Sequence, residues 1–191
     1  MNSLNKINKL YVFLMLILFA STYTLNMCNK IYSCALVFTI FAFTVNIISE
    51  FYSRKLAMLG TFVSSIVSFC LLWGFDYTIK GVVTNGIILI SLVSLFISSY
   101  IGTSILKTNT NLNFHKRNLI SFISYAFIDG VVMSLFFINK FPNHKILTNF
   151  TKELFFKLVY FSIAYILTFI VSNMLLYIRY NKRNSLITDF Q

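Results

Sequence analysis

Long uncharged apolar runs dominate the chain, and they recur at the length needed to cross a membrane. An α-helix rises about 1.5 Å per residue and the hydrocarbon core is about 30 Å thick, so one crossing takes about 20 residues. Runs of this size predict six transmembrane helices, at residues 11–29, 31–49, 56–75, 81–106, 118–139 and 158–178. We therefore predict one integral membrane domain over residues 1–191, an all-α polytopic bundle of six helices.

The pattern inside the runs argues against two other structures. Membrane-spanning strands alternate apolar and polar residues, whereas residues 10–19 are apolar on every side. This first run follows Lys6 and Lys9, as the apolar part of a signal peptide would. It lacks a convincing small-residue cleavage site, and it is long enough to span. We interpret it as the first helix.

The composition agrees with a membrane protein. Hydrophobic residues make up 58% of the chain, charged residues only 11%, and the mean hydropathy is +0.78. Soluble domains carry about 25% charged residues, and disordered chains are poor in hydrophobic ones. The composition therefore excludes both a soluble domain and a disordered chain.

The net charge of +11 comes from 16 Lys and Arg against 5 Asp and Glu. Nucleic-acid binding uses basic residues on one continuous solvated face, but here they lie in short segments between apolar runs. We interpret them as topology signals and lipid contacts, and we expect no nucleic-acid partner. They are more frequent on the side that holds both termini, which predicts cytoplasmic termini. The lysine-rich segment 140–157 opposes that bias, and we expect its part 140–153 to be a loop.

The sequence contains no pattern typical of catalysis or metal binding. There is no HExxH, GxSxG or phosphate-binding loop, and Cys28, Cys34 and Cys70 lack metal-ligand spacing. We expect no enzyme activity, no cofactor and no bound metal.

Asp129 lies in the middle of the fifth predicted span. A carboxylate there costs about 2.5–3.5 kcal/mol on insertion scales, so it needs a polar cavity, a proton path or a partner on a neighbouring helix. Arg117, Ser121 and Tyr125 precede it at four-residue steps, which place them on one helix face. The fifth helix therefore carries a polar stripe that ends at mid-membrane.

Two further acids lie near span ends. Glu50 closes the second span, and Asn46 and Arg54 lie four residues before and after it, so an interfacial Glu50–Arg54 ion pair is one interpretation. Glu153 lies four residues before Lys157, a spacing typical of a surface ion pair of small energy.

The segments around Glu50 and Asp129 resemble those of the vitamin-uptake-transporter family, the bacterial queuosine-precursor transporters. Residues 46–53, NIISEFYS, are similar to its Asn-x-x-Thr-Glu-Val-Tyr-Gly motif. Arg117, Ser121 and Asp129 match the spacing of its fifth-span motif, with Tyr125 in place of a glycine, and Lys157 corresponds to a lysine near the start of its sixth span.

This resemblance implies an uptake transporter of the bacterial inner membrane that imports a queuosine precursor, a deazaguanine base. The candidate substrate-binding residues are Asn46, Glu50, Tyr52, Arg117, Ser121, Tyr125 and Asp129. A carboxylate of Asp129 or Glu50 would accept hydrogen bonds from the base, Asn46 and Arg117 would orient it, and Tyr52 or Tyr125 would stack on it. An unpaired carboxylate would alternatively carry a coupling proton.

The residues leave two other functions open. One is a substrate-binding subunit of an energy-coupling-factor transporter, although the small residues that dock its partner are reduced to Ala20 and Ser21 on the first helix. The other is a membrane assembly protein in which the polar residues only join helices. The oligomeric state is open in each case.

Overall fold

The structure is a computed structural model that describes residues 2–28, 30–74, 78–79, 82–83, 86–108, 111–138 and 140–188, with side chains described between residues 9 and 170 outside the short hairpin. Its elements are α1 (Asn2–Met27), α2 (Ile31–Phe51), α3 (Arg54–Leu71), β1 (Thr78–Ile79), β2 (Val82–Val83), α4 (Ile87–Thr108), α5 (Phe114–Phe137) and α6 (Asn143–Thr188). Six helices within these residues are long and apolar enough to cross a membrane. The predicted all-α bundle of six helices is confirmed.

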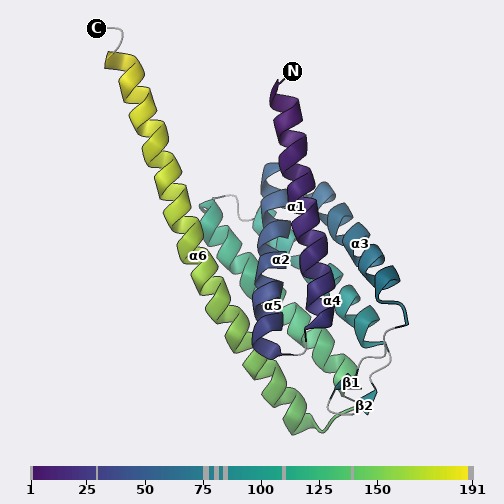
Figure 1. Ribbon diagram of the computed structural model, residues 1–191. Coiled ribbons are helices and arrows are strands. Elements are labelled where there is room, and N and C mark those ends of the chain that lie inside the picture. The colour runs from purple at the N-terminus through teal and green to yellow at the C-terminus, as the bar shows by residue number, and fades with distance from the viewer. Residues whose placement is uncertain are drawn as a thin grey trace.

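The helices alternate in direction, so the start of α1 and the end of α6 lie at the same end of the bundle (Figure 1). We call this the terminal end. The opposite end, which we call the hairpin end, holds the antiparallel β1–β2 pair and the connection from α5 to α6 (Figure 1). Helix α2 contacts each of the other five helices. It is the central element of the bundle.

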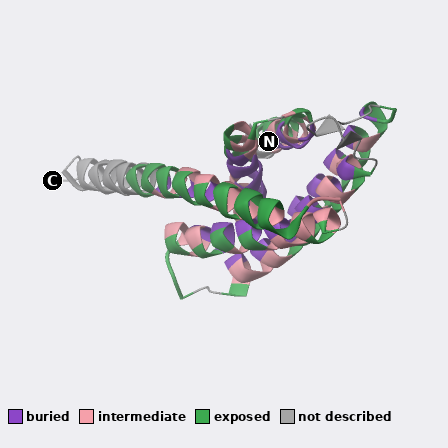
Figure 2. Ribbon diagram, turned by 90° about the horizontal axis from the view of Figure 1, so that it is seen from below, coloured by how far each residue is buried: buried purple, intermediate pink, exposed green. Residues whose placement is uncertain are grey.

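Aromatic side chains fill the core around α2. Phe38 and Phe41 are fully buried there, and the rings of Phe122 on α5 and Phe161 on α6 stack with centroids 4.5 Å apart. Buried residues face one another between the helices, and exposed residues form the outer faces (Figure 2). Many of these outer residues are large and apolar, such as Leu16 and Phe155. An apolar outer surface matches a bundle that faces lipid.

The structure differs from the sequence interpretation at two connections. Residues 143–153 are helical, so the expected loop at 140–153 is wrong over most of its length. The carbonyl of Pro142 accepts hydrogen bonds from the backbone N–H groups of Lys145 and Ile146, which begins α6 before the apolar run. The fourth helix begins at Ile87, after Gly86 with a φ of +85°, whereas the predicted span begins at 81. Predicted span ends at 29, 75 and 139 lie outside the described residues.

Candidate functional site

Three charged side chains meet between α5 and α6. The Nζ atom of Lys157 donates to Oδ2 of Asp129 at 2.5 Å and lies 2.5 Å from Oε1 of Glu153. Glu153 and Lys157 share one face of α6 because they are four residues apart. Gly130 lets α6 approach, since a Cβ atom there would lie 2.6 Å from the Phe150 ring. We call Asp129, Glu153 and Lys157 the triad.

Two further helices contribute to the triad. Ser94 on α4 donates a 2.6 Å hydrogen bond to Oδ1 of Asp129. The Phe38 ring on α2 lies 3.9 Å from Nζ of Lys157, in cation–π contact. Exposed fractions of the side chains are 1% for Lys157, 8% for Asp129 and 30% for Glu153. Charges this deep are tolerated only when they are paired, and here the pairing joins four helices.

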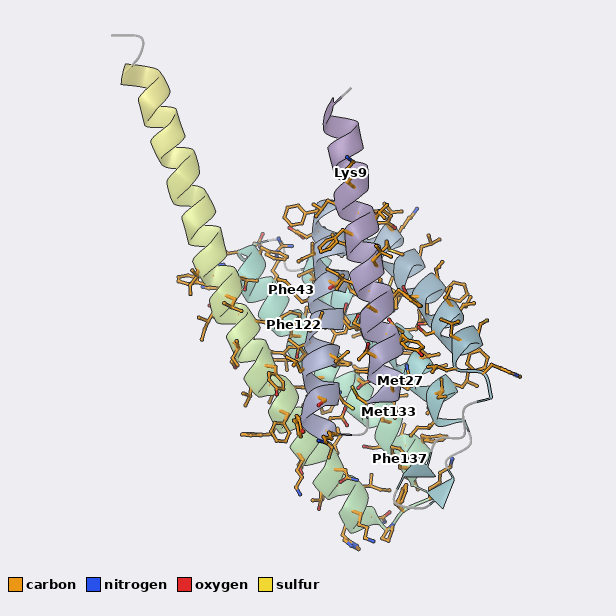
Figure 3. The ribbon with its side chains drawn as sticks, in the orientation of Figure 1. Lys9, Met27, Phe43, Phe122, Met133 and Phe137 are labelled. Atoms are coloured by element: carbon orange, nitrogen blue, oxygen red, sulfur yellow. The ribbon has the colours of Figure 1, made fainter. Side chains whose placement is uncertain are left out.

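A cavity of about 890 Å³ leads from the triad to the hairpin end. On three of its walls the lining residue farthest from that end belongs to or contacts the triad: Asp129 on α5, Lys157 on α6 and Phe38 on α2. Nearer the hairpin end, α5 contributes Met133 and Phe137, which lie along the lower half of the helix in Figure 3. Sites for small molecules have volumes of about 300–1,000 Å³. The cavity is large enough for a small molecule.

A second group of charges lies toward the terminal end. Oε1 of Glu50 accepts from Nη2 of Arg117 at 2.7 Å, and Oε2 accepts from Nζ of Lys107 at 3.1 Å. Arg117 also donates to the backbone carbonyls of Leu106 and Leu112. We call Glu50, Lys107 and Arg117 the Glu50 cluster. None of its residues lines the cavity.

Glu50 is therefore paired across helices, and the Glu50–Arg54 pair considered from the sequence is wrong. The Arg54 guanidinium lies 4.5 Å from the centre of the Tyr100 ring and donates to the Tyr100 carbonyl. Arg54 lies four residues after Glu50, but α2 ends at Phe51 and α3 begins at Arg54, so the two residues do not share one helix. Arg54 contacts Tyr100 on α4 instead.

A hydrogen-bonded network separates the Glu50 cluster from the triad. The Asn46 amide donates to Oδ1 of Asn118 at 2.7 Å and to Oγ of Ser121 at 3.1 Å, and its Oδ1 accepts from the Tyr125 hydroxyl at 3.3 Å. Ser121 also donates to the carbonyl of Gly102 at 2.8 Å. We call Asn46, Asn118, Ser121 and Tyr125 the amide network. All four are fully buried, so this part of the bundle is closed.

The seven predicted site residues divide among these groups. Asn46, Ser121 and Tyr125 belong to the amide network, and Glu50 and Arg117 to the Glu50 cluster. Asp129 alone among the seven lines the cavity. The Tyr52 ring lies 5.1 Å from the Tyr11 ring, beside α1. The structure thus places most of them along one seam between α2 and α5, but it does not gather them around one ligand site.

Sequence reasoning did not include Lys157 and Glu153 among the site residues. Their ion pair is confirmed, but its placement at the surface is wrong, because Lys157 is buried. A signal for Lys157 exists in the sequence: it lies between Phe155-Phe156 and Leu158-Val159, and a mid-membrane Asp129 needs a cation.

The fold and this site define a multi-pass α-helical membrane protein with a charged cavity that ends inside the bundle. Such an arrangement is compatible with a membrane transporter. Comparison with protein families, curated proteins and solved structures finds no match to this chain.

Proposed function

We propose that this protein is a small-molecule uptake transporter whose substrate occupies the cavity. One observation carries the proposal: the cavity extends from the hairpin end to the triad, while the amide network closes the bundle beyond it. Transporters bind substrate near the middle of the membrane and expose the site to one side at a time. Asp129 lies about two thirds of the way along α5, inside the membrane-spanning part of the helix.

The resemblance to queuosine-precursor transporters supplies the proposed substrate, a deazaguanine base. The cavity offers the two kinds of group that such a base needs. The carboxylate-bearing triad can accept its N–H groups, and the lining includes the aromatic rings of Phe38, Phe137 and Phe150. We place the protein in a bacterial inner membrane with cytoplasmic termini. The hairpin end then faces outward, so the cavity is open to the side from which uptake proceeds.

Restoration of queuosine in tRNA tests this function. The host is a bacterium that lacks both precursor synthesis and its own transporter. The wild-type chain should restore queuosine when the precursor is supplied, and Asp129→Asn should not. Ser124→Ala is the matched control on α5, because Ser124 is only partly buried, lies outside the cavity lining and donates to the Ile120 carbonyl of its own helix. Absence of rescue by wild-type protein that is membrane-inserted and monodisperse would overturn the proposed substrate.

Uptake by the purified chain in liposomes separates transport from the two alternative functions. Accumulation of a tritiated deazaguanine base requires no ATPase partner in this assay, so it would contradict an energy-coupling-factor subunit. It would equally contradict an assembly protein without transport. Binding without accumulation would favour the substrate-binding subunit instead.

A further inference from the structure

The three acids with described side chains differ in how many of their oxygens are occupied. Both carboxylate oxygens of Asp129 are bound, one by Lys157 and the other by Ser94. Both oxygens of Glu50 are bound as well, and Glu50 does not line the cavity. Neither carboxylate has an oxygen without a bonding partner.

Glu153 is different. Its Oε1 contacts Lys157, while Oε2 has no hydrogen-bond partner among the residues that the structure describes. Its side chain is the most exposed of the triad and lines the cavity. We infer that Glu153 is the carboxylate that binds the substrate, and that Asp129 and Lys157 position it. This inference rests on the proposed function and assigns a different residue to the contact than sequence reasoning did.

The triad holds Glu153 in place through Lys157. Two carboxylates share one ammonium group, so the triad keeps one negative charge in excess. Asp129 and the Phe38 ring fix Nζ of Lys157 on its other sides. Since Asp129 is fully bonded, the excess charge is available at the open oxygen of Glu153. Lys157 and Asp129 are positioning residues in this arrangement.

The face of α6 leads to Glu153 from the hairpin end. Lys145, Asn149, Glu153 and Lys157 follow one another at four-residue steps, and all four line the cavity. Their exposure falls along the series, from exposed Lys145 and Asn149 to half-buried Glu153 and buried Lys157. A substrate that enters along this face meets Glu153 before it meets the buried pair.

The surrounding charges restrict the class of substrate. Lys140, Lys145 and Lys152 also line the cavity, so its outer part is positive and disfavours a cation. A neutral group with two adjacent N–H donors suits the Glu153 carboxylate better, because Oε2 is open and Oε1 keeps a second lone pair beside its contact with Lys157. The guanine-type edge, a ring N–H beside an amine, has this pattern. The adenine edge pairs one donor with one acceptor. The geometry therefore favours neutral bases with a guanine-type edge.

A change of specificity tests the contact. Glutamine at 153 offers one acceptor and one donor, which match the adenine edge. In purified full-length protein, tritiated 7-deazaguanine should be displaced by guanine and not by adenine. Glu153→Gln should weaken 7-deazaguanine binding about 10- to 100-fold, the loss expected for a charged hydrogen bond, and should let adenine compete. Thr151→Ala, exposed and outside the cavity lining, is the control.

The outcomes separate the two proposals. If wild-type protein does not bind 7-deazaguanine, the proposed substrate is overturned. If wild-type binds it and Glu153→Gln keeps both the affinity and the preference for guanine, the assignment to Glu153 is overturned and the proposed function stands.

A second measurement needs no variant, and its first step needs no substrate. A water-soluble carbodiimide and an amine tag, followed by peptide mass spectrometry, should label Glu153 faster than Asp129 or Glu50. Bound 7-deazaguanine should slow the labelling of Glu153. Labelling of Asp129 at the same rate as Glu153 would contradict the open oxygen on which the assignment rests.

Discussion

The Glu50 cluster and the triad are opposite in composition. In the Glu50 cluster one carboxylate lies between two bases, and both its oxygens are bonded. In the triad two carboxylates share one base, and one oxygen is open. The Glu50 cluster has a net positive charge at the terminal end, and the triad has a net negative charge inside the cavity. An ion cluster with its acceptors filled joins helices, whereas one with an open acceptor can also bind a ligand.

The lysines of the two clusters also differ in their contact with solvent. Side chains of Lys107 and Glu50 are 37% and 24% exposed, against 1% for Lys157. Water and salt screen the exposed charges, while a buried charge that loses its partner keeps nearly the full cost of leaving water. Removing one lysine from each cluster should therefore have very different consequences.

Lys157→Met should have the largest effect of the substitutions considered. It leaves Asp129 and Glu153 close together without their shared cation, and breaking a buried ion pair costs about 3–5 kcal/mol. The free energy of unfolding, measured by titration with denaturing detergent, should fall by that amount. Lys116→Met, an exposed lysine on α5, is the control and should change little.

Neutralising the acids distinguishes charge from packing in this result. Asp129→Asn combined with Glu153→Gln in the Lys157→Met background removes both unpaired charges. Stability should recover in part, because the remaining polar groups can hydrogen-bond to one another and to Ser94. No recovery would mean that Lys157 stabilises the bundle through its packing against Phe38 rather than through its ion pairs.

Gly102→Ala should have the next largest effect, at the closed part between the clusters. A Cβ atom at 102 would overlap the Tyr125 ring, which is fully buried and cannot move aside. Overpacking of this kind costs about 1–3 kcal/mol. Gly60→Ala is the matched control, because its Cβ would meet the flexible end of Met15. Equal melting temperatures for the two variants would contradict a rigid closed part.

The helices were predictable from sequence, since each apolar run has the length of a crossing. The start of α6 was not predictable. Lys145, Lys152 and Glu153 are charged residues typical of a loop, and the sequence does not show that they line a common cavity. Charged residues in a membrane helix are tolerated where they face a polar cavity or a partner. Which face a residue occupies depends on packing, and a single sequence does not contain that information directly.

The candidate site shows the same limit. Asp129 was predictable because its depth follows from its place in an apolar run. Its partner was not, because six runs do not determine which helices touch. The contact between α5 and α6 at Gly130 brings Lys157 to Asp129. Tyr52 was included because it matches the tyrosine of the motif that contains Glu50, yet its ring packs beside α1.

Tyr125→Phe should have a smaller effect than the glycine substitution. It removes only the hydroxyl that donates to Asn46 at 3.3 Å and keeps the ring beside Gly102. Hydrogen bonds between membrane helices contribute about 0.6 kcal/mol on average, and at most about 1.7. A loss larger than that of Gly102→Ala would mean that hydrogen bonding, and not close packing, holds the closed part together.

Lys107→Met should have the smallest effect and is the counterpart of Lys157→Met. Arg117 continues to bind Glu50 through two nitrogen atoms, and exposed ion pairs contribute only about 0.2–1 kcal/mol.

The salt dependence of these two losses of stability sharpens the comparison. At about 1 M salt the screening length falls to about 3 Å, so the difference between wild type and Lys107→Met should vanish. The loss caused by Lys157→Met should persist at the same salt concentration, because the buried Lys157 and Asp129 are shielded from ions. If both losses respond to salt alike, ions reach the triad as freely as they reach the Glu50 cluster, and the contrast between a buried and an exposed cluster is wrong.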